Sequence, residues 1–305
     1  MIWSLVLGVV SGSILYGVPL LYATLGEVTG QRAGIVNLGL EGVMLMGASV
    51  GFVTTVLTGS PAIGVLVAAL AGGLFNLIFG FLVVTRGANQ LASGLVMMFF
   101  GMGLSTLVGK PYLGQPIAAL SKFQVPGLEQ LGWTGPTLFN YDMLVYLSFP
   151  TAILMWWLLY HTRWGLNLRA VGENPESAFA AGRDPYVIRY QALFLGGLLG
   201  AIGGAHLSLA IAQTWSEGMT AGRGFIAIAL VIFSKWHPLR AILGAVLFGG
   251  AVTFQLEMQA CGAPVSSFLM DMIPYLVTLL VLLLWGSARK YAQPASLGRP
   301  YKRAE

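Results

Sequence analysis

The segment Thr162–Gln191, TRWGLNLRAVGENPESAFAAGRDPYVIRYQ, is a long basic interruption between two strongly apolar runs. Within it, Asn174 is typical of a helix N-cap, Pro175 suits a first helical turn, and Gly182 can end a helix. Its arginines place it on the cytoplasmic side of a membrane: they are Arg163, Arg169, Arg183 and Arg189. A short helix between two membrane spans needs a reason to be ordered, and we expect a partner protein to provide it.

The composition of the whole chain indicates a membrane protein. Of its 305 residues, 56% are hydrophobic and 9% are charged, whereas soluble domains carry roughly 25% charged residues. The net charge of +5 gathers in the basic loop and in the tail Ser287–Glu305, where topology and lipid headgroups explain it without nucleic acid. Because Cys261 is the only cysteine, neither an internal disulfide nor a cysteine metal cluster can form, and we expect no metal or cofactor.

Apolar runs of about 20 residues, the length that crosses a bilayer core, divide the chain into about nine segments. They are Ile2–Leu25, Gly34–Leu57, Pro61–Thr85, Ala88–Val108, Asp142–Tyr160, Ala192–Ala212, Gly224–Phe233, Leu239–Leu256 and Phe268–Trp285. Gly224–Phe233 is too short to cross alone, which favours a re-entrant or broken helix. The sequence predicts a single all-α domain over residues 1–305, a polytopic transmembrane bundle of about 9–10 spans that include short or broken helices.

The basic loops also predict an orientation. With Thr162–Gln191 and the basic tail in the cytoplasm, the loop Lys110–Tyr141 and the N-terminus lie outside. Glu27–Arg32 is then a polar link between the first two spans.

One carboxylate, Glu41, interrupts the second apolar run. Because a charge inside a membrane is costly, Glu41 either faces a water-filled pathway or makes a structural hydrogen bond, for instance to a helix N-terminus. Asn37 lies one helical turn earlier and would share its face. Asn89, Gln90 and Ser93 either line a polar path or mark the wet end of the fourth span. Both alternatives stay open for each group.

Small residues suggest where helices pack. Gly196, Gly200 and Gly204 recur at four-residue spacing, which lets two backbones approach closely, and we interpret them as a packing face rather than a substrate contact. Ala33-Gly34 and Ala221-Gly222 each precede an apolar run, an echo that fits either an internal repeat or chance similarity. Arg223 and Glu217 bracket the short apolar segment, where a gate or vestibule is one interpretation.

Signs of catalysis are missing from the sequence. The three histidines are scattered, and neither a zinc-protease motif nor a nucleophile elbow occurs. Gly109-Lys110-Pro111 lacks the spacing and the hydroxyl residue of an ATP-binding loop. We therefore expect no catalytic residues and no enzyme. If ATP drives the protein, another subunit supplies it.

Two distant stretches resemble one family. Arg32–Ala48, RAGIVNLGLEGVMLMGA, resembles a signature of the branched-chain amino acid and simple-sugar permeases of ATP-binding-cassette (ABC) importers. Gly165–Pro175, GLNLRAVGENP, followed by Ala178, Ala181 and Gly182, is similar to the cytoplasmic loop of that family. The form NLGLEG is most similar to the nucleoside and simple-sugar branch.

The resemblance implies partners and a mode of action. The chain would form the translocation path with a second permease, identical or different, in the inner or plasma membrane of a prokaryote. Two cytoplasmic ATPases and an external solute-binding protein would complete the importer. The coupling loop would use Gly165, Arg169, Gly172, Glu173, Asn174, Pro175, Ala178 and Gly182. Arg183-Asp184-Pro185 departs from the apolar residue that many relatives carry after the loop glycine.

Alternatives remain at this point. Within the family, a branched-chain amino acid is the second substrate class. Outside it, a self-sufficient secondary transporter would need more membrane-embedded carboxylates than this chain offers.

Overall fold

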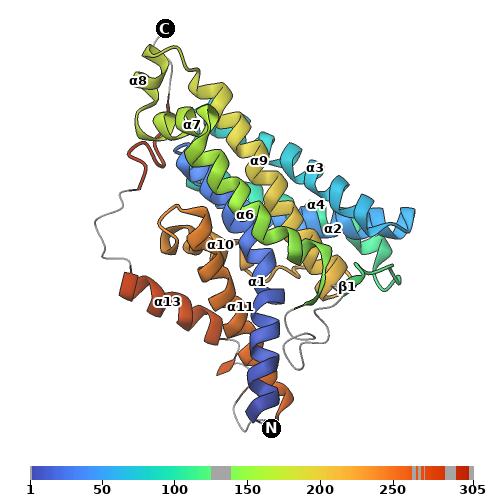
Figure 1. Cartoon of the computed structure of the whole chain (residues 1–305). Coiled ribbons are helices and arrows are strands. Elements are labelled where there is room, and N and C mark those ends of the chain that lie inside the picture. Colours follow the sequence, from blue (N-terminus) through green and yellow to red (C-terminus); the bar gives the residue numbers. More distant parts are fainter. Residues whose placement is uncertain are drawn as a thin grey trace.

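The structure is a computed structural model that describes residues 2–124, 139–262, 266, 269–270, 272–285 and 293–301. It is a bundle of helices (Figure 1). The long helices are α1 (Ile2–Arg32), α2 (Leu40–Thr58), α3 (Pro61–Gly80), α4 (Gln90–Gly109), α6 (Met143–His161), α9 (Pro185–His206) and α11 (Pro238–Ala260). The shorter helices are α7 (Arg163–Glu173), α8 (Pro175–Ala180), α10 (Arg223–Phe233) and α13 (Ile273–Trp285).

Smaller elements complete the described part of the chain. π-Helical turns at Phe81–Thr85 and Leu207–Ile211 extend α3 and α9, and a short 3-10 turn at Lys110–Tyr112 follows α4. Strand β1 (Lys122–Gln124) pairs antiparallel with β2 (Asn140–Asp142) in the outer loop, of which residues 125–138 lie outside the described part.

The spans agree with the predicted all-α membrane bundle. Within the described residues, seven helices are long and apolar enough to cross a membrane, and α10 is a shorter apolar helix of 11 residues. α10 rises about 16 Å, roughly half of the ~30 Å hydrocarbon core. The prediction of a short segment that cannot cross alone is confirmed.

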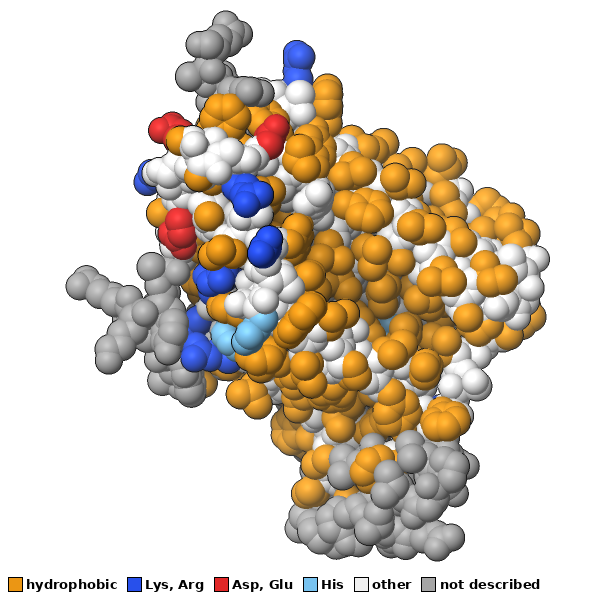
Figure 2. Space-filling model, turned by 45° about the horizontal axis from the view of Figure 1, so that its top comes forward, with side chains coloured by type: hydrophobic (Ala, Val, Ile, Leu, Met, Phe, Trp, Pro, Cys, Tyr) orange, Lys and Arg blue, Asp and Glu red, His pale blue; other side chains and the backbone are white. Residues whose placement is uncertain are grey.

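The ends of the bundle differ in character. Helices α7 and α8 lie at the same end as the C-terminus, and the N-terminus of α1 lies at the opposite end (Figure 1). Hydrophobic side chains cover the flank of the bundle, whereas blue and red side chains gather near the α7–α8 end (Figure 2). This distribution fits the predicted orientation, with α7 and α8 in the cytoplasm.

Helices α1 and α9 form the centre of the bundle, and glycines allow their close approach. A Cβ on Gly196 would lie 3.0 Å from the carbonyl oxygen of Gly26 in α1. A Cβ on Gly200 would lie 2.9 Å from the side chain of Leu40, and one on Gly204 would overlap the carbonyl of Met44, both in α2. All three glycines of the predicted packing face therefore lie where helices meet.

Three boundaries differ from the sequence prediction. Glu27–Arg32 is not a link, because α1 continues through it to Arg32. Asn37 does not share a helical face with Glu41, because it lies before α2 in non-helical backbone. The apolar segment predicted to begin at Ala192 belongs to a helix, α9, that begins earlier, at Pro185, with Asp184 as its N-cap. In each case a polar side chain inside the bundle has a partner, so polarity alone misplaced the boundary.

Candidate functional site

Helices α7 and α8 form an elbow, residues 162–182, at the end of the bundle predicted to be cytoplasmic, and local capping signals build it. The side chain of Thr162 accepts from the amide of Gly165 at 3.1 Å, and that of Asn174 accepts from the amide of Ser177 at 3.0 Å. Pro175 opens α8, and Gly182 ends the turn with φ of 77°, a conformation that favours glycine. The predicted short helix and its cap are confirmed, while α7 was not foreseen.

The elbow is seated tightly on the bundle. A Cβ on Gly165 would overlap the carbonyls at the end of α6, and one on Gly172 would overlap the carbonyl of Arg32. Ala178 is buried, and the guanidinium of Arg169 lies 4.9 Å from the ring centre of Tyr160. These residues hold the elbow, which leaves Glu173, Asn174 and the rest of α8 facing outward.

A segment of the tail, residues Gln293–Tyr301, lies across the base of this elbow and is called the tail strap below. Ser296 donates to the carbonyl of Gly172 from its amide at 3.0 Å and from its hydroxyl at 2.7 Å. The amide of Ala295 donates to the carboxylate of Glu173 at 3.2 Å, and the amide of Gly298 donates to the carbonyl of Gly34 at 3.2 Å. The strap therefore ties α7 to the segment that follows α1.

That segment, residues 33–39, is called the α1–α2 connection, and buried polar side chains hold it. One carboxylate oxygen of Glu27 accepts from the Asn37 amide at 3.0 Å and from Gln31 Nε2 at 2.9 Å. The side chain of Asn37 donates to Asn76 Oδ1 at 2.8 Å, and the amide of Val36 donates to the side-chain oxygen of Gln90 at 2.8 Å. Non-helical backbone at this depth is tolerated because its polar groups are satisfied.

Charged groups flank the same connection. The buried guanidinium of Arg189 in α9 donates to the carbonyl of Ala33 at 3.2 Å, and that of Arg32 donates to the hydroxyl of Tyr160 at 2.8 Å. The indole of Trp236 donates to Gln31 at 2.7 Å. The end of α1 therefore contacts α6, α9 and the turn after α10 through hydrogen bonds.

Glu41 lies at the start of α2 and caps α10. One carboxylate oxygen accepts from the Thr220 hydroxyl at 2.5 Å and the Gly222 amide at 2.8 Å, and the other accepts from the Gly224 amide at 2.6 Å. Gly224 has no room for a Cβ against Glu41, so the two backbones are in close contact. A carboxylate on a helix N-terminus is a favourable charge-assisted arrangement. This is the structural bond that the sequence left as one of two alternatives.

The other polar candidates separate into different roles. Asn89 is exposed and caps α4 by accepting from the amide of Ala92 at 3.0 Å. Gln90 and Ser93 are buried, and Gln90 bonds to the α1–α2 connection. None of Asn37, Glu41, Asn89, Gln90 and Ser93 lines the membrane cavity described next, so a place on the solute path stays a prediction for them.

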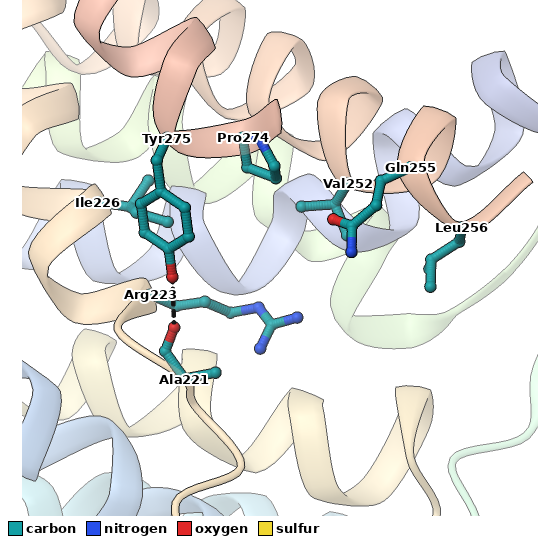
Figure 3. Close-up of a pocket in the computed structure, with 8 residues that line it drawn as sticks. All are labelled: Ala221, Arg223, Ile226, Val252, Gln255, Leu256, Pro274 and Tyr275. Atoms are coloured by element: carbon teal, nitrogen blue, oxygen red, sulfur yellow. Dashed lines mark hydrogen bonds between the residues drawn. The ribbon is translucent and has the colours of Figure 1, made fainter. Parts of the chain in front are cut away.

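A cavity of about 320 Å³ lies between α10, α11 and α13 (Figure 3). Arg223, Gln255 and Tyr275 contribute its polar groups, and the Tyr275 hydroxyl donates to the carbonyl of Ala221 at 3.1 Å. Its remaining lining is Ala221, Ile226, Val252, Leu256 and Pro274. Two of these residues were singled out from the sequence: Arg223, for a gate or vestibule, and Ala221, in the echo of Ala33-Gly34.

Sequence reasoning missed several of the groups that hold this arrangement. Glu27 and Arg189 looked like loop residues, and Asn76 is one amide inside a long apolar run. Asp142 and His206 form a buried pair at 3.1 Å although 63 residues separate them in the chain. A buried polar residue inside an apolar run is the signal that could have pointed to Asn76.

The fold defines a class: a multi-pass helical membrane protein with two short helices, α7 and α8, at one end of the bundle. The chain belongs to the family described as the permease component of branched-chain amino acid transport systems, whose family model matches residues 8–283. It is therefore a membrane-embedded transport subunit of an ABC importer, located in the cell membrane, and ATP hydrolysis belongs to a separate subunit.

Individual relatives are similar over nearly the whole chain. A Haloferax volcanii protein with the provisional name glucose ABC transporter permease protein is 35% identical over 97% of this chain and 98% of its own. The nucleoside ABC transporter permease protein of Lactococcus lactis is 34% identical over 91% of this chain and 92% of its own. The guanosine ABC transporter permease protein of Bacillus subtilis is 30% identical over 96% of each chain. No solved structure matches this chain.

Proposed function

We propose that the chain forms the translocation path of an ABC importer for a nucleoside or a simple sugar. The family supplies the general partners, a cytoplasmic ATPase and an external solute-binding protein. The names of the relatives, which include nucleoside, guanosine and glucose permeases, favour these solutes over a branched-chain amino acid. We further propose a second permease subunit, identical or different, and two copies of the ATPase.

One observation carries the proposed mechanism: a continuous series of contacts leads from the elbow to the short helix inside the membrane. Gly172 of α7 lies against the carbonyl of Arg32 at the end of α1. The α1–α2 connection follows, and Glu41 at its far end holds the N-terminus of α10. A displacement of the elbow is therefore passed on through packed backbone rather than absorbed by a flexible loop.

The exposed side of α8 is the proposed docking surface for the ATPase. Glu176, Ser177 and Phe179 are exposed, while Ala178 on the opposite side is buried in the bundle. With one side fixed, α8 moves only with α7. Closure of the ATPases on ATP would then move α7, the α1–α2 connection and α10 together, which changes access to the path.

The test compares Phe179→Ala with Val187→Ala in the assembled transporter. Phe179 is 37% exposed on α8, and Val187 is 52% exposed at the cytoplasmic end of α9, outside the proposed surface. We expect Phe179→Ala to lower ATP-driven uptake roughly tenfold, an interface change of about 1.4 kcal/mol, and to weaken co-purification of the ATPase. Val187→Ala should match the parent. Equal uptake and ATPase recovery in both variants would show that α8 is not the docking element.

A further inference from the structure

With the elbow in the cytoplasm, as predicted, the cavity between α10, α11 and α13 falls on the outer side of the bilayer midplane. α10 rises only about 16 Å from the cytoplasmic turn, so its N-terminus, which bears Arg223, ends near the middle of the hydrocarbon core. Val252 and Gln255 lie in the second half of α11, which begins on the cytoplasmic side at Pro238. Tyr275 lies in the first turn of α13. The cavity is on the side from which an external binding protein delivers solute.

Its polar groups suit a ligand rich in hydrogen-bond acceptors. Arg223 donates through Nη1 to the carbonyls of Met219 and Thr220, both at 3.2 Å, and among the described residues its other guanidinium N–H groups have no such bond. Figure 3 shows the guanidinium extending into the space between the three helices, with the amide of Gln255 directed toward the same space. A cation at this depth is costly unless it is paired or faces a pathway, and the two carbonyls bind only one nitrogen of this guanidinium.

Its remaining walls suit a flat ring. Ile226, Val252, Leu256 and Pro274 give an apolar lining, and Tyr275 is 48% exposed. An aromatic face beside apolar walls favours the stacking of a heterocyclic base. A volume of about 320 Å³ lies at the lower end of the range for small-molecule sites, roughly 300–1,000 Å³.

The charges of the lining discriminate between solutes. Among the residues that the structure describes, the lining includes one cation, Arg223, and no carboxylate. A zwitterionic amino acid would leave its ammonium group without an anionic partner inside the membrane, whereas an uncharged nucleoside needs none. A free sugar would satisfy the polar groups but would leave the apolar walls in contact with hydroxyls.

We propose that this cavity is a nucleoside subsite on the translocation path, with Arg223 and Gln255 as hydrogen-bonding groups and Tyr275 as the surface for the base. This inference rests on the proposed function. The subsite is also connected to the coupling contacts. The turn that carries Ala221 and Arg223 bonds to Tyr275 on one side and to Glu41 on the other. A motion passed through Glu41 therefore displaces the guanidinium relative to Tyr275.

The first experiment tests whether the cavity holds water and nucleoside. Cys261 is the only cysteine of this chain, so Cys261→Ser leaves the chain without a thiol before Val252→Cys is introduced in the cavity or Leu247→Cys on the outward face of α11, and labelling is read on this chain alone. In the full complex in proteoliposomes, a membrane-permeant maleimide should label Val252→Cys at least tenfold faster, because only a hydrated thiol forms the reactive thiolate. Guanosine at millimolar concentration should slow this labelling at least threefold, and leucine should not.

The outcomes that overturn the proposal are specific. Equal labelling of the two thiols would show that the cavity is not a hydrated site. Protection by leucine or by glucose, but not by guanosine, would assign it to another solute.

The second experiment measures transport. Arg223→Gln should lower ATP-driven guanosine uptake at least tenfold while the complex still co-purifies, Arg223→Lys should recover part of it, and Leu276→Ala on the outward face of α13 should match the parent. If the parent complex imports guanosine and Arg223→Gln imports it equally well, the subsite is wrong and the proposed function stands. If the parent imports neither nucleoside nor sugar with ATP, the proposed function itself fails.

Discussion

Two buried carboxylates, Glu27 and Glu41, lie at the two ends of the same connection and are held differently. Glu27 uses one oxygen, which accepts from Gln31 in its own helix and from the Asn37 amide. Glu41 uses both oxygens, and all three of its donors belong to the segment Thr220–Gly224. The first carboxylate folds a local turn, and the second joins two elements that are about 180 residues apart.

The difference indicates two roles: Glu27 fixes the shape of the α1–α2 connection, and Glu41 passes its motion to α10. A local bond moves with the turn it stabilises, whereas a bond between elements passes the motion of one to the other. Glu27 therefore gives the α1–α2 connection its shape, and Glu41 is the point where that connection acts on α10. The predictions below test this difference between Glu27 and Glu41 and the contacts around the same connection.

The largest effect should come from the contact between Gly172 of the elbow and the carbonyl of Arg32, at the end of the helix that carries Glu27. In Gly172→Val the added side chain overlaps the carbonyl of Arg32, which is backbone and cannot rotate away. Overpacking of this kind costs about 3 kcal/mol, and we expect loss of the assembled transporter and of uptake. The matched control is Gly182→Val, where the space is open and only the left-handed φ of 77° is strained, at roughly 1–2 kcal/mol. Detergent thermal unfolding and uptake measure both, and equal stability of the two variants would contradict the tight seat.

The second effect compares the same substitution, Glu to Gln, at the two carboxylates. In Glu41→Gln the new NH₂ group must face one of the donors that now bind a carboxylate oxygen, so a charge-assisted bond of roughly 1.5–3 kcal/mol is lost. In Glu27→Gln the amide oxygen can accept both bonds that one oxygen of Glu27 accepts now, so we expect a change below about 1 kcal/mol. Uptake should fall at least tenfold in Glu41→Gln and less than twofold in Glu27→Gln. If uptake fell more in Glu27→Gln than in Glu41→Gln, the shape of the connection would limit transport, and not the bonds from Glu41 to the N-terminus of α10.

The sequence predicted the features that depend on local chemistry. The apolar runs predicted the spans, and Asn174, Pro175 and Gly182 predicted α8 with its cap. Gly34 and Gly222 looked like a weak echo, and in the structure both have a left-handed φ, 89° and 79°, shortly before α2 and α10. Glu41 joins those two helix starts.

What the sequence could not predict depends on partners far away in the chain. Arg189 looks like a surface charge until the carbonyl of Ala33, 156 positions earlier, accepts from its guanidinium inside the bundle. The tail looked like a basic tether to lipid, yet Ser296 bonds to Gly172. A hydropathy window counts the cost of burying each polar group, but it contains no information on a hydrogen-bond partner more than 100 residues away in the chain.

The smallest effect concerns pH and the cytoplasmic turn beside the end of α1. Burial, with Arg240 and Arg32 nearby, lowers the pKa of His237 below its ordinary 6.5, and its ring centre lies 5.2 Å from that of Tyr160. Because the folded protein then binds the proton less readily than the unfolded chain, the contribution of His237 to stability is complete above pH 6.5 and is lost as the pH falls below it.

We therefore expect the thermal midpoint to fall less between pH 7.5 and 5.5 in His237→Gln than in the parent, by a degree or two at most, since the ring is only partly buried. If His237→Gln and the parent respond identically to pH, protonation at the end of α1 does not affect the fold, and the comparison rests on the two carboxylates alone.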